Sequence, residues 1–397
     1  MVEPTEDRAV SVRALVAVGA VQVTGALILN TMPAIVGALT RSGRLDSSMA
    51  GYLIGIDLAS QVAGTILFLR HGRSFPWHMT LTSGIVLMAV GNALSCLGST
   101  SAALFATRLI AGTGAGVVRA ACLVAFARAR DPARAIAGLN AAQVLSQGMA
   151  FATFGWLTSS VGWFGPYLAL SIVALGGLGT SFWWPKLEHS SPIRSRSFAF
   201  GWSGSLCLVA VFMYFAAQSA IWAFAEAIGT GANQSTTHIT YALECTTLAG
   251  IAATPVVFAL SSRLTVRQGL VSGLTVTLVG LYLLTVNLGF GPFALGLSLF
   301  NFAWCLTTPF EFAVAAVADK QGNTAAAFSA SDGLGLATGP AIAGLLITQH
   351  RALTLEVLAA LFTMLSIALF AFASRLHERP VYAEGSDSVT PSAPGPL

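Results

Sequence analysis

Two arginines, Arg108 and Arg119, interrupt the apolar segment 102–128. As a helix, the roughly 26 apolar residues would rise about 39 Å and could cross a bilayer with some tilt. Eleven positions at about 100° each place the two arginines within about 20° of one another on one face, which Gly112 and Ala115 share. An arginine at this depth costs a few kcal/mol unless it faces a cavity or an acid. The pair therefore indicates a polar pathway through a membrane.

Acidic residues in other apolar segments are candidate proton carriers: Asp57, Glu244, Glu311 and Asp332. A carboxyl group in a low-dielectric site can load and release a proton near neutral pH. Alternatively, each is a fixed partner of an arginine or stays protonated throughout. For Arg119 the residues leave two interpretations open, because its guanidinium fork could anchor a substrate carboxylate or pair with Asp57.

Two stripes combine an aromatic ring, an amide and a carboxylate, as a site for an amphipathic organic ligand would. They are Tyr214, Gln218, Trp222 and Glu226, spaced by four, and Asn301, Trp304, Thr308 and Glu311, spaced 3-4-3. With Asn30 in the first apolar segment, these residues are candidate substrate contacts. The alternative is helix packing, in which amides bond across a bundle. Glu226 lies near a span end, where it could serve a gate.

The composition indicates an all-α polytopic membrane protein, since 55% of the 397 residues are hydrophobic and 9% are charged. A soluble chain would carry about 25% charged residues. Twelve spans are expected at 14–39, 49–69, 77–98, 102–127, 135–161, 164–184, 201–228, 236–260, 268–288, 293–317, 323–348 and 352–374. The single, scattered cysteines indicate packing residues rather than disulfides or a metal site.

Buried polar residues are concentrated in eight spans, while the third, sixth, ninth and twelfth carry few. Asn92 is the main exception, in the third span. Helices that carry polar side chains must surround a polar site or cavity, and helices without them face lipid. This three-span rhythm within two six-span halves is typical of the repeats from which many secondary transporters are built.

Fifteen basic residues fall in segments on one side of the twelve spans and three on the other, which predicts that both termini are cytoplasmic. The expected divisions are an N-terminal half at 1–184, a basic linker at 185–200, a C-terminal half at 201–375 and a disordered tail at 376–397. The acidic start of the chain does not resemble a signal peptide.

The rhythm and several motifs resemble the major facilitator superfamily over residues 10–375. In the fourth span, Arg108 is followed by the glycines Gly112, Gly114 and Gly116, as in a family motif. The loop after the second span matches another motif at Arg70, Gly72 and Arg73, and Gly339 and Pro340 resemble a glycine–proline motif. The resemblance implies two pseudo-symmetric halves that alternate access to a midplane site lined by spans 1, 4, 7 and 10. It also implies a coupling or structural role for Arg108.

These observations predict a proton-coupled secondary transporter of a small organic solute, with a carboxylated or aromatic anion favoured. The alternatives are a drug or metabolite exporter acting as a proton antiporter, and a non-transporting receptor or assembly factor of the same fold. No enzyme motif occurs, because the glycines of segment 112–116 lie inside an apolar helix rather than after a strand. The expected partners are substrate, protons and the bilayer, without nucleic acid, metal or cofactor. The expected setting is a monomer in a bacterial inner membrane.

Overall fold

The computed structural model describes residues 10–71, 75–98, 100–130, 132–185, 201–261, 263–286, 288–318, 323–348 and 352–373. In these ranges the regular structure is helical, apart from an isolated bridge between Val10 and Ala129. The loop residues Gly72 and Arg73 lie outside the described residues. So do nearly all of the expected linker and the whole expected tail.

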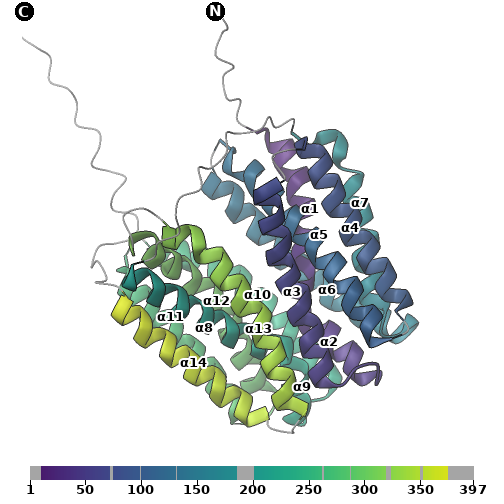
Figure 1. The fold of residues 1–397 in the computed structure, drawn as a ribbon. Helices are drawn as coiled ribbons and strands as arrows, with labels where there is room; N and C mark the ends of the chain where they lie inside the picture. Colours follow the sequence, from purple (N-terminus) through teal and green to yellow (C-terminus); the bar gives the residue numbers. More distant parts are fainter. Residues whose placement is uncertain are drawn as a thin grey trace, which may run out of the picture.

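The helices of each half follow one another as the twelve expected spans (Figure 1). The first half contains α1 (Val12–Asn30), α2 (Met32–Arg41), α3 (Ser47–His71), α4 (Trp77–Leu97), α5 (Ser101–Ala127), α6 (Pro132–Val161) and α7 (Gly165–Leu178), followed by the short η2 (Ser181–Trp183). The second contains α8 (Trp202–Ala223), α9 (Ala225–Gly231), α10 (Thr236–Ser261), α11 (Val266–Thr285), α12 (Phe290–Val317), α13 (Asn323–Thr348) and α14 (Ala352–Ala373).

The first expected span of each half is broken into two helices rather than one. Thr31, with φ −114° and ψ 17°, separates α1 from α2, and Phe224, with φ −109° and ψ 17°, separates α8 from α9. Pro33 at the start of α2 has no N–H to continue the helical hydrogen bonds. The two breaks occupy equivalent positions, as expected for related halves.

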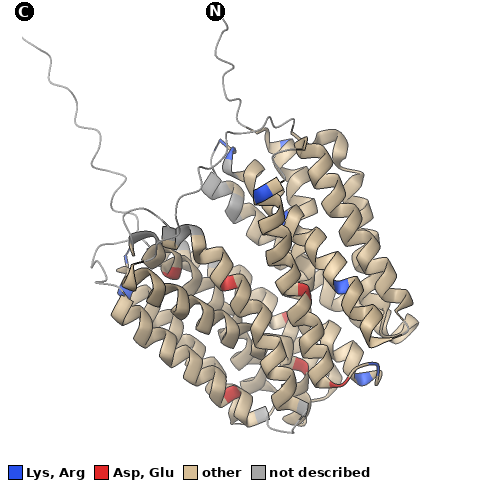
Figure 2. Ribbon diagram, viewed as in Figure 1, with Lys and Arg blue, Asp and Glu red and all other residues tan. Residues whose placement is uncertain are grey.

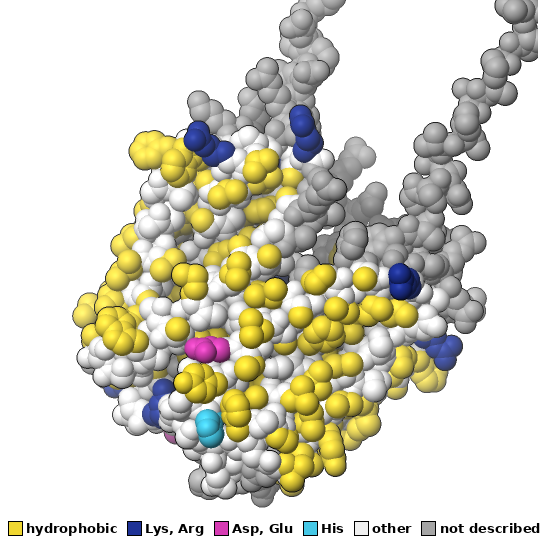
Figure 3. Space-filling model, turned by 180° about the vertical axis from the view of Figure 1, so that it is seen from behind, with side chains coloured by type: hydrophobic (Ala, Val, Ile, Leu, Met, Phe, Trp, Pro, Cys, Tyr) yellow, Lys and Arg dark blue, Asp and Glu magenta, His cyan; other side chains and the backbone are white. Residues whose placement is uncertain are grey.

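Nine of the described helices are long and apolar enough to cross a membrane. The helices α6 and α10, with 30 and 26 residues, are also long enough, and their amide and hydroxyl side chains lower their hydropathy. Hydrophobic side chains cover much of the face seen in Figure 3, and charged side chains are sparse along the ribbon in Figure 2. The molecule is therefore a multi-pass membrane protein.

The halves pack together in the parts of their helices that are farther from the chain termini. Gly51 and Gly55 of α3 approach Pro340 and Ala337 of α13 so closely that an added Cβ would collide with a carbonyl oxygen. On the other side of the bundle, Gly148 of α6 lies against Thr247 of α10. Small residues permit such approach within a membrane.

The hydrophobic core is likewise shared between the halves only in the part of the bundle that is farther from the chain termini. One cluster runs from the second half into the far parts of α1, α2 and α6, where it includes Met32, Ile35 and Phe151. The terminus-side core of the first half, around Val18 and Val118, is a separate cluster. Continuous packing across the halves thus closes the end opposite the termini.

Candidate functional site

Arg108 lies in a sealed polar network inside the first half. Its Nη1 is 3.1 Å from Oδ2 of Asp57, and both side chains are almost wholly buried. Its Nε and Nη2 atoms donate to the side chains of Asn92 and Ser95 and to the Gly91 carbonyl oxygen, at 2.7 to 3.2 Å. A guanidinium with all of these acceptors is satisfied. The geometry therefore gives Arg108 a structural position away from any solute.

This network decides between two interpretations that the sequence left open for Arg119. Asp57 pairs with Arg108 rather than with Arg119, because Arg108 lies on the part of α5 that faces α3 and α4. The third span is also not purely lipid-facing, since its Asn92 points inward to the arginine. Tyr167 of α7, which the sequence did not single out, lies with its ring 4.6 Å from the Arg108 guanidinium carbon.

Arg119, eleven residues farther along α5, faces the other half. It is half-buried, and its charge acts on the buried carboxylate of Asp332 in α13. Asp332 in turn interacts electrostatically with Glu311 of α12. The two arginines on this face of α5 therefore interact with different acids, because they lie at different depths and different helices pack beside each of them. Arg119, Asp332 and Glu311 form one electrostatically coupled group of ionisable side chains, in the parts of α5, α12 and α13 that are nearer the chain termini.

The carboxyl groups of this group are poorly satisfied. Glu311 is fully buried, and among the described residues neither of its side-chain oxygens has a hydrogen-bond partner. Oδ1 of Asp332 also lacks one. Leaving an ionised carboxylate buried in this way costs several kcal/mol. Each of these carboxyl groups must therefore be protonated, or must gain a partner or water when the conformation changes.

The stripe on α8 divides between two environments. Tyr214 and Gln218 are fully buried within the second half, where the Tyr214 hydroxyl is 3.5 Å from Oγ1 of Thr277. A solute cannot reach either side chain in this conformation. Both polar atoms of the Gln218 amide lack a hydrogen-bond partner within the described structure. The amide is therefore the least satisfied member of the stripe.

Trp222, on the same helix, joins the two halves. Its Nε1–H donates to the carbonyl oxygen of Leu29 in α1 at 3.2 Å, and its ring packs edge-on against Phe151 of α6. Beyond it, Arg41 of α2 forms an ion pair with Glu226 of α9. Asn30, the neighbour of Leu29, is half-buried at this level. These contacts close the end of the bundle opposite the termini.

On α12, Asn301 and Trp304 are half-buried and differ in their contacts. Nδ2 of Asn301 donates to the carbonyl oxygen of Thr246 in α10 at 2.9 Å, which is a packing contact. The Trp304 ring lies edge-on to Phe215, with 5.9 Å between ring centroids. Glu244 of α10 is also half-buried. Half-exposed rings and amides on these helices remain available to a solute.

The motif glycines hold helices at close range rather than binding a ligand. A Cβ at Gly112 would collide with the Asp57 carbonyl oxygen, and one at Gly114 would lie 2.5 Å from that of Gly84. Gly339 packs in the same way against α8, while the Pro340 carbonyl faces α3. Arg70 is exposed at the end of α3.

Comparison with solved structures defines the class of fold. No family model matches the sequence, and no curated protein is similar to it in sequence. The structure is similar to a D-xylose–proton symporter, with a TM-score of 0.72 and 12% identity over 93% of this chain and 99% of that one. It is similar to a proton-dependent oligopeptide transporter, with a TM-score of 0.72 and 12% identity over 92% and 99%. It is also similar to the nucleoside transporter NupG, with a TM-score of 0.69 and 11% identity over 91% and 98%.

The chain therefore has the major facilitator fold, with twelve membrane helices in two pseudo-symmetric halves. This confirms the fold that the resemblance of the sequence implied. Within the described residues, no group of three or more His, Cys, Asp and Glu side chains is placed to hold a metal ion.

Proposed function

We propose that this chain is a proton-coupled secondary transporter of a small organic solute that works by alternating access. The observation that carries the proposal is the group of Arg119, Asp332 and Glu311, in which two under-satisfied acids of one half face an arginine of the other. Ionisable groups at this depth are expensive and mark pathways for ions or substrates. Two of the structural neighbours are a D-xylose–proton symporter and a proton-dependent oligopeptide transporter, which supports the same conclusion.

Glu311 is the favoured proton carrier of this group. Since its carboxyl is fully buried without a partner, it is neutral in the conformation described. A movement of the halves that admits water, or brings Arg119 closer, stabilises the ionised form, and the proton leaves. The protonation state then biases the equilibrium between two conformations, which is the requirement for coupling.

The substrate that fits best is an organic anion, carboxylated and aromatic. Arg119 is half-buried and acts on Asp332 of the other half, so its two-pronged guanidinium can also take the carboxylate of a solute that enters there. The half-exposed Trp304 ring offers an apolar plane, and Asn301 an amide. A thermal-shift screen of organic anions tests this class. Stabilisation by an anion that disappears in Arg119→Ala supports it, whereas an unchanged shift contradicts it.

The proposed setting is the inner membrane of a bacterium, with both termini cytoplasmic and the monomer as the working unit. In that orientation the structure is closed on the outer side, where Trp222 and the Arg41–Glu226 pair join the halves. Substrate would exchange with the cytoplasm in this conformation.

Solute flux in proteoliposomes under an imposed pH gradient tests the coupling. An inside-alkaline gradient should drive uptake by the wild type, and Glu311→Gln should abolish gradient-driven accumulation while leaving exchange of solute. Glu356→Gln is the matched control, because Glu356 is also a buried carboxyl but lies on the peripheral α14. Equal loss in both variants would contradict the assignment to Glu311.

The same preparation separates the alternatives. Accumulation in inverted vesicles driven by an inside-acid gradient would indicate a proton antiporter that exports its solute. If flux survives the joint replacement of Asp57, Arg119 and Asp332 unchanged, the proposed pathway is wrong. If the wild type itself shows no flux above background with any solute tested, a receptor or assembly role becomes the better explanation.

A further inference from the structure

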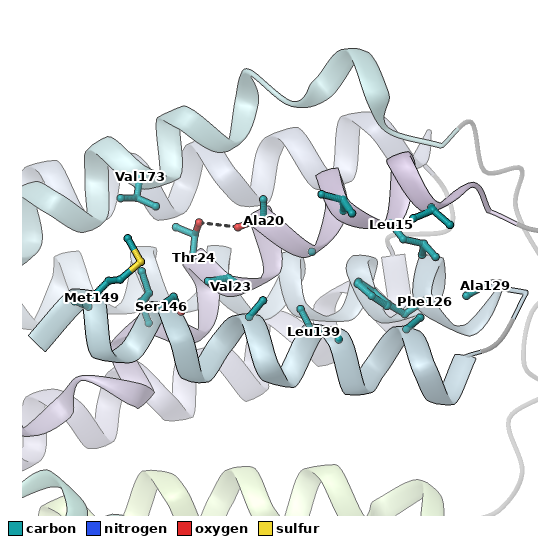
Figure 4. A pocket seen from close by; sticks show the side chains of 18 of the residues that line it. Leu15, Ala20, Val23, Thr24, Phe126, Ala129, Leu139, Ser146, Met149 and Val173 are labelled. Carbon is teal, nitrogen blue, oxygen red and sulfur yellow. Dashed lines mark hydrogen bonds between the residues drawn. The ribbon is translucent and has the colours of Figure 1, made fainter. Parts of the chain in front are cut away.

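The first half contains a pocket whose lining does not include Arg119, Asp332 or Glu311. It is a pocket of about 880 Å³ between α1, α6 and α7, reaching the end of α5 (Figure 4). Along α1 it extends from Val12 to Leu27, which is about 22 Å of helix. Its volume is within the range of ligand pockets, roughly 300 to 1,000 Å³.

The lining offers almost nothing to a polar ligand. The hydroxyls of Thr24, Ser146 and Thr153 each donate to a carbonyl oxygen of their own helix, at 3.1, 2.7 and 2.7 Å. Among the described residues that line the pocket, the other side chains are apolar except Arg130, and none is acidic. An occupant must therefore be largely hydrocarbon, and any charge it carries must be negative and lie near Arg130.

The equivalent space in the second half is filled by protein. There α8, the counterpart of α1, packs directly on α13, where a Cβ at Gly335 would lie 2.5 Å from the Phe212 carbonyl oxygen. Ser366 of α14 donates to the Ala210 carbonyl of α8 at 2.9 Å. In the first half, by contrast, a Cβ at Gly138 of α6 would meet no heavy atom within 4 Å. The pocket is thus a specific departure from the symmetry of the fold.

The pocket opens sideways toward the surrounding hydrocarbon. Val12, Val16 and Met149 at its rim are 77%, 67% and 73% exposed. In Figure 4, the side chains of Met149 on α6 and Val173 on α7 point toward one another at one end of the pocket. In a multi-pass protein, apolar side chains exposed at this depth contact lipid. A molecule dissolved in the bilayer can therefore enter without crossing water.

The end of the pocket nearer the termini is basic and aromatic. Arg130 lines it, and Arg13, next to Val12 in α1, lies over the Trp183 ring at 5.8 Å. Arginine and tryptophan at a membrane boundary are suited to an anionic headgroup. The geometry points to a site for an anionic phospholipid, with acyl chain in the pocket and headgroup at Arg130 and Arg13. The lipid fills the space that separates α1 from α6 and α7, whereas α8 packs directly on α13 and α14 in the second half.

Native mass spectrometry of the full chain, delipidated in detergent and titrated with dioleoyl-phosphatidylglycerol or dioleoyl-phosphatidylcholine, tests this site. The wild type should bind one phosphatidylglycerol about 25-fold more tightly than phosphatidylcholine, about fivefold for each of the two arginines at the headgroup. Arg130→Gln should lower that preference about fivefold. Gly138→Leu, which fills the pocket, should weaken both lipids about tenfold or more, because each methylene that loses its contact accounts for about fourfold.

Gly176→Leu is the matched control, since Gly176 of α7 also has nothing within 4 Å of an added Cβ and does not line the pocket. It should bind like the wild type. Each variant is first checked for monodispersity and thermal unfolding. If Gly138→Leu fails that check, Ala142→Leu, also in the lining, replaces it. Equal affinity for the two lipids in the wild type would overturn the proposal. So would wild-type binding by the pocket-filling variant, or a dimer in the wild type that this variant separates.

Discussion

The buried pair of Arg108 and Asp57 supports a quantitative prediction, because every partner of the arginine is identified. Asp57→Asn removes the negative charge that lies 3.1 Å from Nη1 and leaves the guanidinium fully buried. Breaking such a pair costs about 3–5 kcal/mol. Three neutral acceptors and the Tyr167 ring remain around Arg108. We therefore expect a loss at the lower end, about 3 kcal/mol of unfolding free energy.

The assay is unfolding of the purified protein in mixed micelles of increasing denaturing-detergent fraction, repeated by thermal scanning. Asp57→Asn, Arg108→Met and the double variant complete a mutant cycle, in which methionine retains much of the length of the arginine. The double variant should be more stable than the sum of the single losses by about 2 kcal/mol, because it leaves no unpaired charge.

Additive losses within about 0.5 kcal/mol would refute the pairing. Transport supplies a second and independent check. Since the Asp57 carboxylate is already bound by Arg108 and by the Gln61 amide at 3.1 Å, Asp57→Asn should leave the pH profile of flux unchanged. Loss of pH dependence would instead identify Asp57 as the proton carrier, the alternative that the sequence left open.

Arg119→Ala should weaken binding of an anionic solute by at least about 1.5 kcal/mol, the contribution of a charged hydrogen bond, and calorimetry that finds wild-type affinity would contradict the anchoring role. Trp222→Phe loses the hydrogen bond to Leu29 and should shift the equilibrium about fivefold toward opening at the far end. Spin-label distances across that end measure the shift, and an unchanged distribution argues against this latch. Gly116→Val should collide with the Gln61 carbonyl and destabilise the bundle by about 1–3 kcal/mol, so an unaltered melting temperature would disprove the close approach.

Much of the fold could be predicted because the bilayer constrains the chain so strongly. Hydrocarbon requires long apolar helices, and the spans expected from hydropathy agree with the helices within several residues. The breaks at Thr31 and Phe224 were not predicted, since two helices in succession retain one continuous apolar pattern.

Pairing of charges could not be predicted from position along one helix. Arg108 and Arg119 share a face by angle, yet one pairs within its own half and the other faces Asp332. The difference depends on which helices lie beside α5 at each depth. Asn92 shows the same limit, because a single polar residue in a clean span gives no indication of its partner.

By its own pattern of apolar runs, polar intervals and basic loops, the sequence determined a twelve-helix bundle in two related halves with charge inside the membrane. Only the tertiary structure decided which acid each arginine meets, which end of the bundle is closed, and that a lipid-sized pocket lies behind α1 but not behind α8. The physical reason is the distance along the chain over which each effect acts. Hydropathy acts on each helix independently, whereas ion pairs, closure and cavities depend on contacts between side chains that are far apart in the chain.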